Sequence, residues 1–288
     1  MRAFSKINLI LDVINKRADG YHELQSIMQT LALHDTVTIT RDSGSLPNFV
    51  LTCSDPNLPT DESNLVTQAA KYIIEKYNIA LPVRIQLEKR IPQAAGLAGG
   101  SSDCAATLAG LNILFNLNIP LHNGGQSSES LMSIGQRFGA DVPFCLLGGT
   151  ALAEGIGEQL TPLPPHPHCW VVLFCPNIPV STAEVFKNWK PNMNLPGNIS
   201  AMVQALSNKD LNEIAANFSN NLTHITAKTH PIINQLIDTM KIKGALNAAM
   251  SGSGPTIFGY FNNKEAAEKA HRYFENIAGR AFLTEITS

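Results

Sequence analysis

The chain has 288 residues, of which 44% are hydrophobic and 15% are charged, and its formal net charge at pH 7 is -2. A chain of this length and apolar content can bury the core of one large or two ordinary domains, which excludes a disordered protein. The near-neutral charge and the lack of a long basic run argue against nucleic acid as a partner, and no segment approaches the roughly 18 apolar residues of a membrane-spanning helix.

The first half of the chain is predicted to alternate strands with helices. Residues 2–13 read as a strand, whose period of two places Lys6 and Asn8 together on one face, away from the main apolar stripe. The turn that follows leads to Tyr21 and His22 at the start of the next element. The other strands predicted in this half are residues 37–40, 49–52, 83–91 and 149–154, and the helices are residues 63–77, 104–117 and 127–138.

Two local features in this half are predicted in more detail. The strands at 37–40 and 49–52 are expected to form a hairpin around residues 43–45, because that segment is rich in Gly and Ser. Gly139 is expected to cap the C-terminus of the helix that precedes it.

A proline-rich segment, residues 162–167, is the best candidate for a linker, and it divides the chain into domains at 1–161 and 162–288. The strands predicted beyond it are residues 169–175, 246–250, 256–260 and 280–286, and the helices are residues 181–189, 199–205, 210–217, 232–241 and 264–275. Strands and helices alternate irregularly and hairpins occur, which favours an α+β fold over a doubly wound parallel sheet.

The most informative segment is the loop at residues 92–103, which has five Gly and Ser residues between positions 96 and 102. Residues this small let the backbone approach a ligand. A helix N-terminus behind them presents unpaired N–H groups, so the segment can bind an anion, most economically a phosphate. Gly clusters also serve turns, and Ser101, Ser102 or Asp103 could cap the helix, so the loop alone leaves both interpretations open. It matches neither G-x-x-x-x-G-K-[ST] nor G-x-G-x-x-G.

Other residues supply the remaining parts of a phosphoryl-transfer site. Lys6 offers a compact positive charge beside Asn8, and Asp141, flanked by small residues, could accept the proton of a hydroxyl group. A second small-residue loop at 251–254 could close over a ligand. Taken singly, Lys6 is typical of a charge at a strand edge and Asp141 of a cap or turn, so the combination carries the hypothesis.

The cysteine pattern indicates neither disulfides nor a metal site. The five cysteines form no C-x-x-C pair, and in the cluster His166-Pro167-His168-Cys169 the proline makes tetrahedral convergence awkward. Because no secretion signal is evident either, we expect a cytoplasmic protein without a bound metal of its own.

Three segments in order, residues 4–9, 92–103 and 251–256, resemble the motifs of the GHMP kinase superfamily. Residues 17–24 and 139–151 resemble the branch whose acceptor is a cytidine diphosphate-linked methylerythritol, and the resemblance covers nearly the whole chain. It implies a two-lobed α+β fold with an S5-like N-terminal domain and a ferredoxin-like C-terminal domain. The implied activity is ATP-dependent phosphorylation in the non-mevalonate route to isopentenyl diphosphate, with Mg²⁺ accompanying ATP, by a monomer or homodimer.

The resemblance also implies a role for each matching residue. Lys6 and Asp141 would be the catalytic pair, with Asp141 taking the proton of the acceptor's 2-hydroxyl and Lys6 lowering that hydroxyl's pKa. On the acceptor side, Asn8 would contact the polyol, and the cytosine would be bound by Tyr21, His22, Thr182 and Phe186. On the ATP side the implied residues are Asn64, Lys89, Pro92, Gln93, Ala94, Ala95, Gly96, Leu97, Ala98, Gly99, Gly100, Ser101 and Ser102.

The chain departs from the superfamily pattern in the loop itself, where Ala94, Ala95 and Ala98 replace residues that are often glycine. Alanine disfavours a positive φ, so we expect the left-handed positions to fall on Gly96, Gly99 and Gly100, where an added side chain should be most harmful.

Two other functions stay open at this point. One is a different small-molecule kinase of the same superfamily, acting for example on homoserine or mevalonate. The other is a nucleotide-binding regulatory protein that has the fold without the chemistry, against which stands the presence of both Lys6 and Asp141.

Overall fold

The computed structural model describes residues 1–41, 49–123, 129–191 and 196–287, and its contacts divide the chain into two compact units. Unit 1 comprises Met1–Ser5, His34–Gln93 and Ala98–Leu147, and unit 2 comprises Lys6–Leu33, Ala94–Leu97 and Gly148–Ser288. Neither unit is one continuous segment. The division between residues 161 and 162 therefore stays a prediction.

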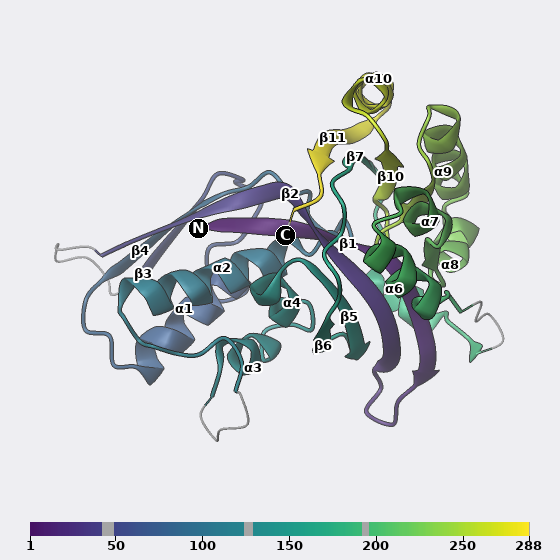
Figure 1. The fold of residues 1–288 in the computed structure, drawn as a ribbon. Coiled ribbons are helices and arrows are strands. Elements are labelled where there is room, and N and C mark those ends of the chain that lie inside the picture. The colour runs from purple at the N-terminus through teal and green to yellow at the C-terminus, as the bar shows by residue number, and fades with distance from the viewer. Residues whose placement is uncertain (42–48, 124–128, 192–195, 288) are drawn as a thin grey trace. The chain divides into compact units, whose positions relative to one another are not determined.

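Unit 1 is a sheet with helices packed on it (Figure 1). Strand β4 (Val83–Glu88) pairs in parallel with β3 (Phe49–Cys53) and antiparallel with the second half of β2 (His22–Arg41). The helices of this unit are α1 (Leu65–Lys76), α2 (Gly99–Leu114), α3 (Leu131–Gln136) and α4 (Val142–Leu147). Small residues of α1 and α2, such as Ala69 and Ala105, pack with the sheet residues Val37 and Ile85, so the core of this unit lies between helices and strands.

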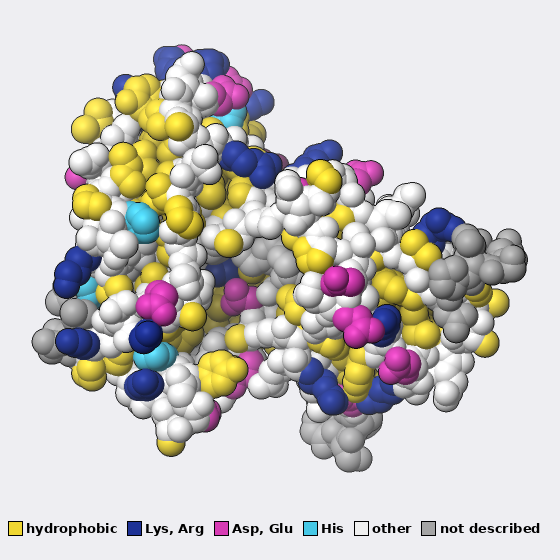
Figure 2. Space-filling view, turned by 180° about the vertical axis from the view of Figure 1, so that it is seen from behind, with side chains coloured by type: hydrophobic (Ala, Val, Ile, Leu, Met, Phe, Trp, Pro, Cys, Tyr) yellow, Lys and Arg dark blue, Asp and Glu magenta, His cyan; other side chains and the backbone are white. Residues whose placement is uncertain are grey.

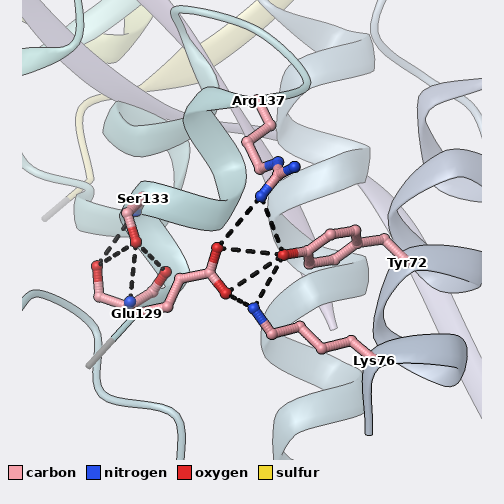
Figure 3. A network of polar contacts seen from close by, with 6 residues as sticks. Tyr72, Lys76, Glu129, Ser133 and Arg137 are labelled. Atoms are coloured by element: carbon pink, nitrogen blue, oxygen red, sulfur yellow. Dashed lines mark hydrogen bonds and ion pairs between the residues drawn. The ribbon is translucent and has the colours of Figure 1, made fainter. Parts of the chain in front are cut away.

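A polar network at the surface of unit 1 ties α3 to α1 (Figure 3). The hydroxyl of Tyr72, on α1, donates to Glu129 at 3.1 Å and accepts from Arg137 at 3.2 Å. Lys76, one turn further along α1, pairs with the same carboxylate. Exposed ion pairs contribute about 0–1 kcal/mol each, so this network adds little to the stability of the unit.

The structure corrects three predictions in unit 1. The segments at 37–40 and 49–52 do not pair as a hairpin, because β4 lies between β2 and β3. The predicted turn at 43–45 falls outside the described residues. The helix predicted at 127–138 is α3, which begins at Leu131 behind the N-cap Ser130, and residues 127–128 are likewise not described. It ends at Arg137 as C-cap, so Gly139 is not the cap but opens the turn into the unpredicted helix α4.

Unit 2 contains the rest of β1 (Arg2–Lys16) and the first half of β2, which pairs antiparallel with β5 (Thr150–Gly155). Strand β6 (Gln159–Pro162) pairs with β5, and the short β8 (Ser219–Asn220) runs parallel to β1. A separate antiparallel sheet has the order β11 (Gly279–Glu285), β7 (Trp170–Pro176), β10 (Ile257–Phe261), β9 (Ala248–Met250).

The helices of unit 2 are α5 (Thr182–Lys187), α6 (Ile199–Asn208), α7 (Leu211–Ala216), α8 (Thr223–Thr229), α9 (Ile232–Ile242) and α10 (Lys264–Glu275). Helices α9 and α10 lie beside the β11-β7-β10-β9 sheet (Figure 1). Their buried residues, including Met240 and Phe274, pack in one cluster with Phe174 and Ile257 of that sheet. The strand pairing is mainly antiparallel and the helices are separate from the sheets, which confirms the α+β class. The elements of unit 2 that were not predicted, β6, β8 and α8, are short and carry no extended apolar pattern.

None of the helices in the described ranges is long and apolar enough to cross a membrane. On the face drawn in Figure 2, Lys and Arg side chains lie among Asp and Glu side chains.

Candidate active site

Lys6 and Asn8 lie side by side on β1, as the period of two predicts. Lys6 Nζ donates to Asn8 Oδ1 at 2.8 Å, Asn8 Nδ2 donates to Ser26 Oγ at 2.8 Å, and Ser26 Oγ donates to the carbonyl of Ile10 at 2.6 Å. All three side chains are buried, with Lys6 only 4% exposed. A buried ammonium needs such partners, and the chain of hydrogen bonds fixes where the positive charge sits.

The loop at 251–254 is fastened to the same strand. The N–H of Gly252 donates to Asn8 Oδ1 at 3.1 Å, so the oxygen that accepts from Lys6 also accepts from this loop. Asn220 Nδ2 donates to the carbonyls of Met250 and Gly252 at 2.7 and 2.8 Å. These bonds give the loop a defined conformation in unit 2.

Part of the glycine loop, Ala94–Leu97, belongs to unit 2 and contacts both of these elements. Ser251 Oγ donates to the carbonyl of Gly96 at 2.9 Å, and the N–H of Lys6 donates to the carbonyl of Leu97 at 3.2 Å. A Cβ on Gly96 would lie 2.2 Å from the Ser251 carbonyl oxygen, and Gly96 has a φ of +74°. Only glycine permits this approach of two backbones.

The expected distribution of left-handed residues is wrong at four positions. Ala94 and Ala98 have φ values of 47° and 58°, whereas Gly99 and Gly100 are the first residues of α2 and lie outside the left-handed region. A left-handed alanine costs about 1–2 kcal/mol, and here the conformation lets the Ala98 carbonyl accept the Ser102 N–H at 2.8 Å, the first bond of the helix.

The N-cap of α2 is therefore Ala98 and none of the polar residues that follow it. Ser102 Oγ donates instead to the Gly99 carbonyl at 2.9 Å. Because alanine has no side-chain acceptor, the N–H groups of the first turn are not occupied by a cap, and they remain suited to an anion.

Three of the residues that the resemblance places near the nucleotide have side-chain partners within unit 1. Asn64 is the N-cap of α1, with Oδ1 accepting from the Val66 N–H at 2.9 Å. Lys89 is buried and donates to Asp103 Oδ2 at 2.6 Å. Gln93 Nε2 donates to Asp55 Oδ2 at 2.9 Å. Whether any of these side chains contacts a nucleotide stays a prediction.

Asp141 is half-buried and directly precedes α4, and its carbonyl accepts the Cys145 N–H at 3.0 Å. Helix α4 packs on α2, and a Cβ on Gly139 would lie 3.7 Å from Ser101 Oγ. The segment that carries Asp141 therefore lies beside the first turn of α2 in unit 1, which is a suitable place for a base that serves a phosphate-binding loop.

An aromatic group lies at the start of β2 in unit 2. The His22 ring is 5.3 Å from the ring of Phe186 and 5.6 Å from that of Trp189, measured between centroids. Partial burial, and to a lesser extent Lys16, lowers the pKa of His22. Tyr21 is 61% exposed, so its ring is accessible for stacking.

Helix α5, which carries Phe186, is connected to the loop at 251–254, because the hydroxyls of Thr182 and Ser253 are 2.8 Å apart. Trp189, Ser26 and Asp35, a partner of Lys89, were not predicted from the sequence as parts of a site. No local pattern singles them out: each lies within or next to an ordinary element, and its role depends on residues far away in the sequence.

Two family models match the chain. Residues 64–149 match the model described as the GHMP kinases N terminal domain, and residues 202–280 match the GHMP kinases C terminal model. A protein of Lachnoclostridium phytofermentans named 4-diphosphocytidyl-2-C-methyl-D-erythritol kinase is 48% identical over 99% of this chain and 96% of its own length.

Solved structures agree with these matches. A crystal structure of 4-(cytidine 5'-diphospho)-2C-methyl-D-erythritol kinase has a TM-score of 0.84 and 31% identity, covering 100% of this chain and 99% of its own. A homoserine kinase from Cytophaga hutchinsonii has a TM-score of 0.71 at 19% identity, covering 99% of this chain and 95% of its own, and this likeness concerns the fold alone.

Proposed function

The chain belongs to the GHMP kinases, and from this membership we propose that it transfers the γ-phosphoryl group of ATP to the 2-hydroxyl of 4-diphosphocytidyl-2-C-methyl-D-erythritol. The products are ADP and the 2-phosphate, in the non-mevalonate route to isopentenyl diphosphate. The observation that carries the proposal is the 48% identity to a kinase of this name over nearly the full length of both chains.

In the proposed reaction the acceptor oxygen attacks the γ-phosphorus, the bond between that phosphorus and the bridging oxygen of ADP breaks, and the hydroxyl proton passes to Asp141. Lys6 lowers the pKa of the hydroxyl and offsets charge near the γ-phosphate. Its fixed position beside Asn8, at 2.8 Å, supports this role, because catalysis by a preoriented charge requires no reorganisation during the reaction.

The backbone of the loop at 92–102 is proposed to bind the phosphates of ATP. Support comes from the first turn of α2, whose N-cap, Ala98, offers no competing side-chain acceptor. Mg²⁺ would enter as part of the ATP complex and stabilise charge on the phosphates. Asn64 is proposed to lie near the adenine.

We assign recognition of the cytidine part of the substrate to residues of unit 2. Tyr21 and Phe186 would stack on the two faces of the base, His22 would form hydrogen bonds with its edge, and Thr182 would lie nearby. The contact between His22 and Phe186 supports the assignment, since it joins an aromatic ring to a side chain that can both donate and accept. Asn8 is proposed to contact the polyol.

The proposed partners are this small molecule and ATP, and we place the protein in the cytoplasm as a monomer or homodimer, without nucleic-acid or membrane partners. The test is a coupled assay of ADP release with ATP and Mg²⁺, in which 4-diphosphocytidyl-2-C-methyl-D-erythritol, homoserine and mevalonate are compared at equal concentration. Turnover of the first substrate alone supports the proposal. Turnover of homoserine or mevalonate without it would replace the proposal by another small-molecule kinase, and ATP binding without turnover of any acceptor would favour a regulatory protein.

A further inference from the structure

Three charged side chains of unit 1 are buried together beside the start of α2. Lys89 Nζ donates to Asp103 Oδ2 at 2.6 Å and also pairs with Asp35. The side chains of Asp35, Lys89 and Asp103 are 0%, 8% and 4% exposed. Removing one member would leave a buried charge without its partner, so the three residues, called here the Lys89 cluster, act as a unit.

The Lys89 cluster is attached to the chain on both sides of the loop at 92–102. Asp35 Oδ1 accepts the backbone N–H groups of the two residues just before the loop, with 2.9 Å to the nitrogen of Ile91. Asp103 is the fifth residue of α2, directly after the first turn and one position beyond the loop. Lys89 thus connects the strand end that enters the loop with the helix that leaves it.

The ammonium group lies directly against the helix start. A Cβ on Gly99 would lie 3.5 Å from Lys89 Nζ and 3.0 Å from Ile91 Cγ2. The N–H groups that precede Ser102 in this first turn have no acceptor within the helix, and they are the groups suited to bind a phosphate. The cluster therefore lies beside the N–H groups that are suited to bind a phosphate.

A direct electrostatic attraction of ATP does not explain the cluster. Two carboxylates and one ammonium leave a net charge of -1 when all three are ionised, which repels a polyphosphate. Burial raises the pKa of Asp103, with Lys89 opposing the shift and Asp35 adding to it. Protonation of Asp103 would make the cluster neutral. In neither state does it present a net positive charge.

We propose that Asp35 and Asp103 are positioning residues for ATP: acting through Lys89, they hold the first turn of α2 so that its N–H groups meet the phosphates. The proposal rests on the proposed function, because it takes ATP as the ligand of the loop. It assigns Lys89 to this cluster in place of the direct nucleotide contact that the family resemblance implies.

The test measures binding of ATP, ADP and adenosine by calorimetry, without an acceptor substrate. Asp103→Ala should weaken the binding of ATP and ADP roughly 10- to 100-fold, which is the contribution of a hydrogen bond to a charged group. The binding of adenosine should not change, because only the phosphates depend on the loop. Lys89→Met should give the same pattern, and the double variant should bind no worse than either. Asp103→Asn keeps an acceptor for Lys89 and should recover most of the affinity.

Glu129→Gln is the matched control, since it removes a carboxylate of the same unit from the surface network of Figure 3 and should bind ATP as the wild type does. The proposal is overturned if Asp103→Ala binds ATP as well as or better than the wild type while Lys89→Met loses both ATP and adenosine, because Lys89 would then be a direct ligand. Additive losses in the double variant would overturn it too.

Circular dichroism shows which variants fold. Should Asp103→Ala not fold, Lys89→Met decides: loss of ATP and ADP with adenosine retained supports the proposal, and equal loss of all three overturns it. ATP binding without phosphoryl transfer would overturn the proposed function and leave this test intact, whereas a wild-type chain that binds no ATP would overturn both.

Discussion

Replacing Gly96 by alanine should damage the site more than any other single-methyl change in the glycine loop. The new Cβ would lie 2.2 Å from the Ser251 carbonyl oxygen, where ordinary contacts begin at 3.4 Å, so the two backbones must separate by the difference. Separation breaks the 2.9 Å bond from Ser251 Oγ to Gly96, at a cost of about 1 kcal/mol, and the left-handed φ of +74° adds about 1–2 kcal/mol.

A total of about 2–3 kcal/mol corresponds to a fall in Tm of roughly 5 °C or more for a chain of this size. Since a misplacement of about 1 Å can reduce a rate about 100-fold, kcat/KM for ATP should fall by a similar factor. The measurements are a thermal melt and steady-state kinetics with ATP as the varied substrate.

Gly100→Ala is the matched control for stability. Its Cβ would meet only Leu65 Cδ1, at 3.9 Å, and alanine is about 1 kcal/mol better than glycine within a helix, so its Tm should equal or exceed that of the wild type. A Gly96→Ala variant with wild-type Tm and wild-type kcat/KM would refute the argument that the two loops need this close approach.

Three further outcomes are expected. Asp141→Asn should lower kcat by about 10²–10⁴ with KM for ATP little changed, as measured by ADP release, and an unchanged kcat would make Asp141 a structural turn residue. Phe186→Leu should raise KM for the cytidine substrate about 3- to 10-fold at constant kcat, whereas the exposed Tyr273→Leu should leave KM unchanged; equal effects would exclude selective stacking at Phe186. Burial lowers the pKa of His166 to about 4, so the neutral ring stabilises the folded state above its unfolded pKa of 6.5, and this stability is lost as the pH falls toward 4. The free energy of unfolding, measured by urea titration, should fall by about 3 kcal/mol more for the wild type than for His166→Phe when the pH is lowered from 7 to 4. Equal falls in the two proteins would contradict the assignment.

The parts of the site that sequence predicted well are those set by local geometry. Lys6 and Asn8 are two residues apart on a strand, so they must share a face, and their side chains are indeed hydrogen-bonded. A helix does follow the small residues of the glycine loop, as predicted, although it begins at Gly99, five residues before the predicted start at 104. Such features depend on neighbours along the chain, which the sequence displays directly.

The parts that sequence missed depend on contacts between distant segments. Asp35 meets Lys89 across 54 residues, so no local pattern distinguishes it from a solvated charge. The order of β3, β4 and β2 is equally nonlocal, and adjacency in sequence suggested a hairpin that does not form. The left-handed alanines illustrate a related limit. Alanine disfavours the left-handed conformation by about 1–2 kcal/mol, and this preference is outweighed where the backbone must begin a helix.

The central claim is that this chain phosphorylates one defined hydroxyl, and identification of the product tests it most directly. The wild-type chain is incubated with ATP, Mg²⁺ and 4-diphosphocytidyl-2-C-methyl-D-erythritol, and the product is examined by ³¹P and ¹³C NMR. We expect one new phosphomonoester on the 2-hydroxyl, formed in equal amount with ADP. A phosphate on another hydroxyl, or no phosphorylated product from an enzyme that phosphorylates homoserine or mevalonate under the same conditions, would contradict it.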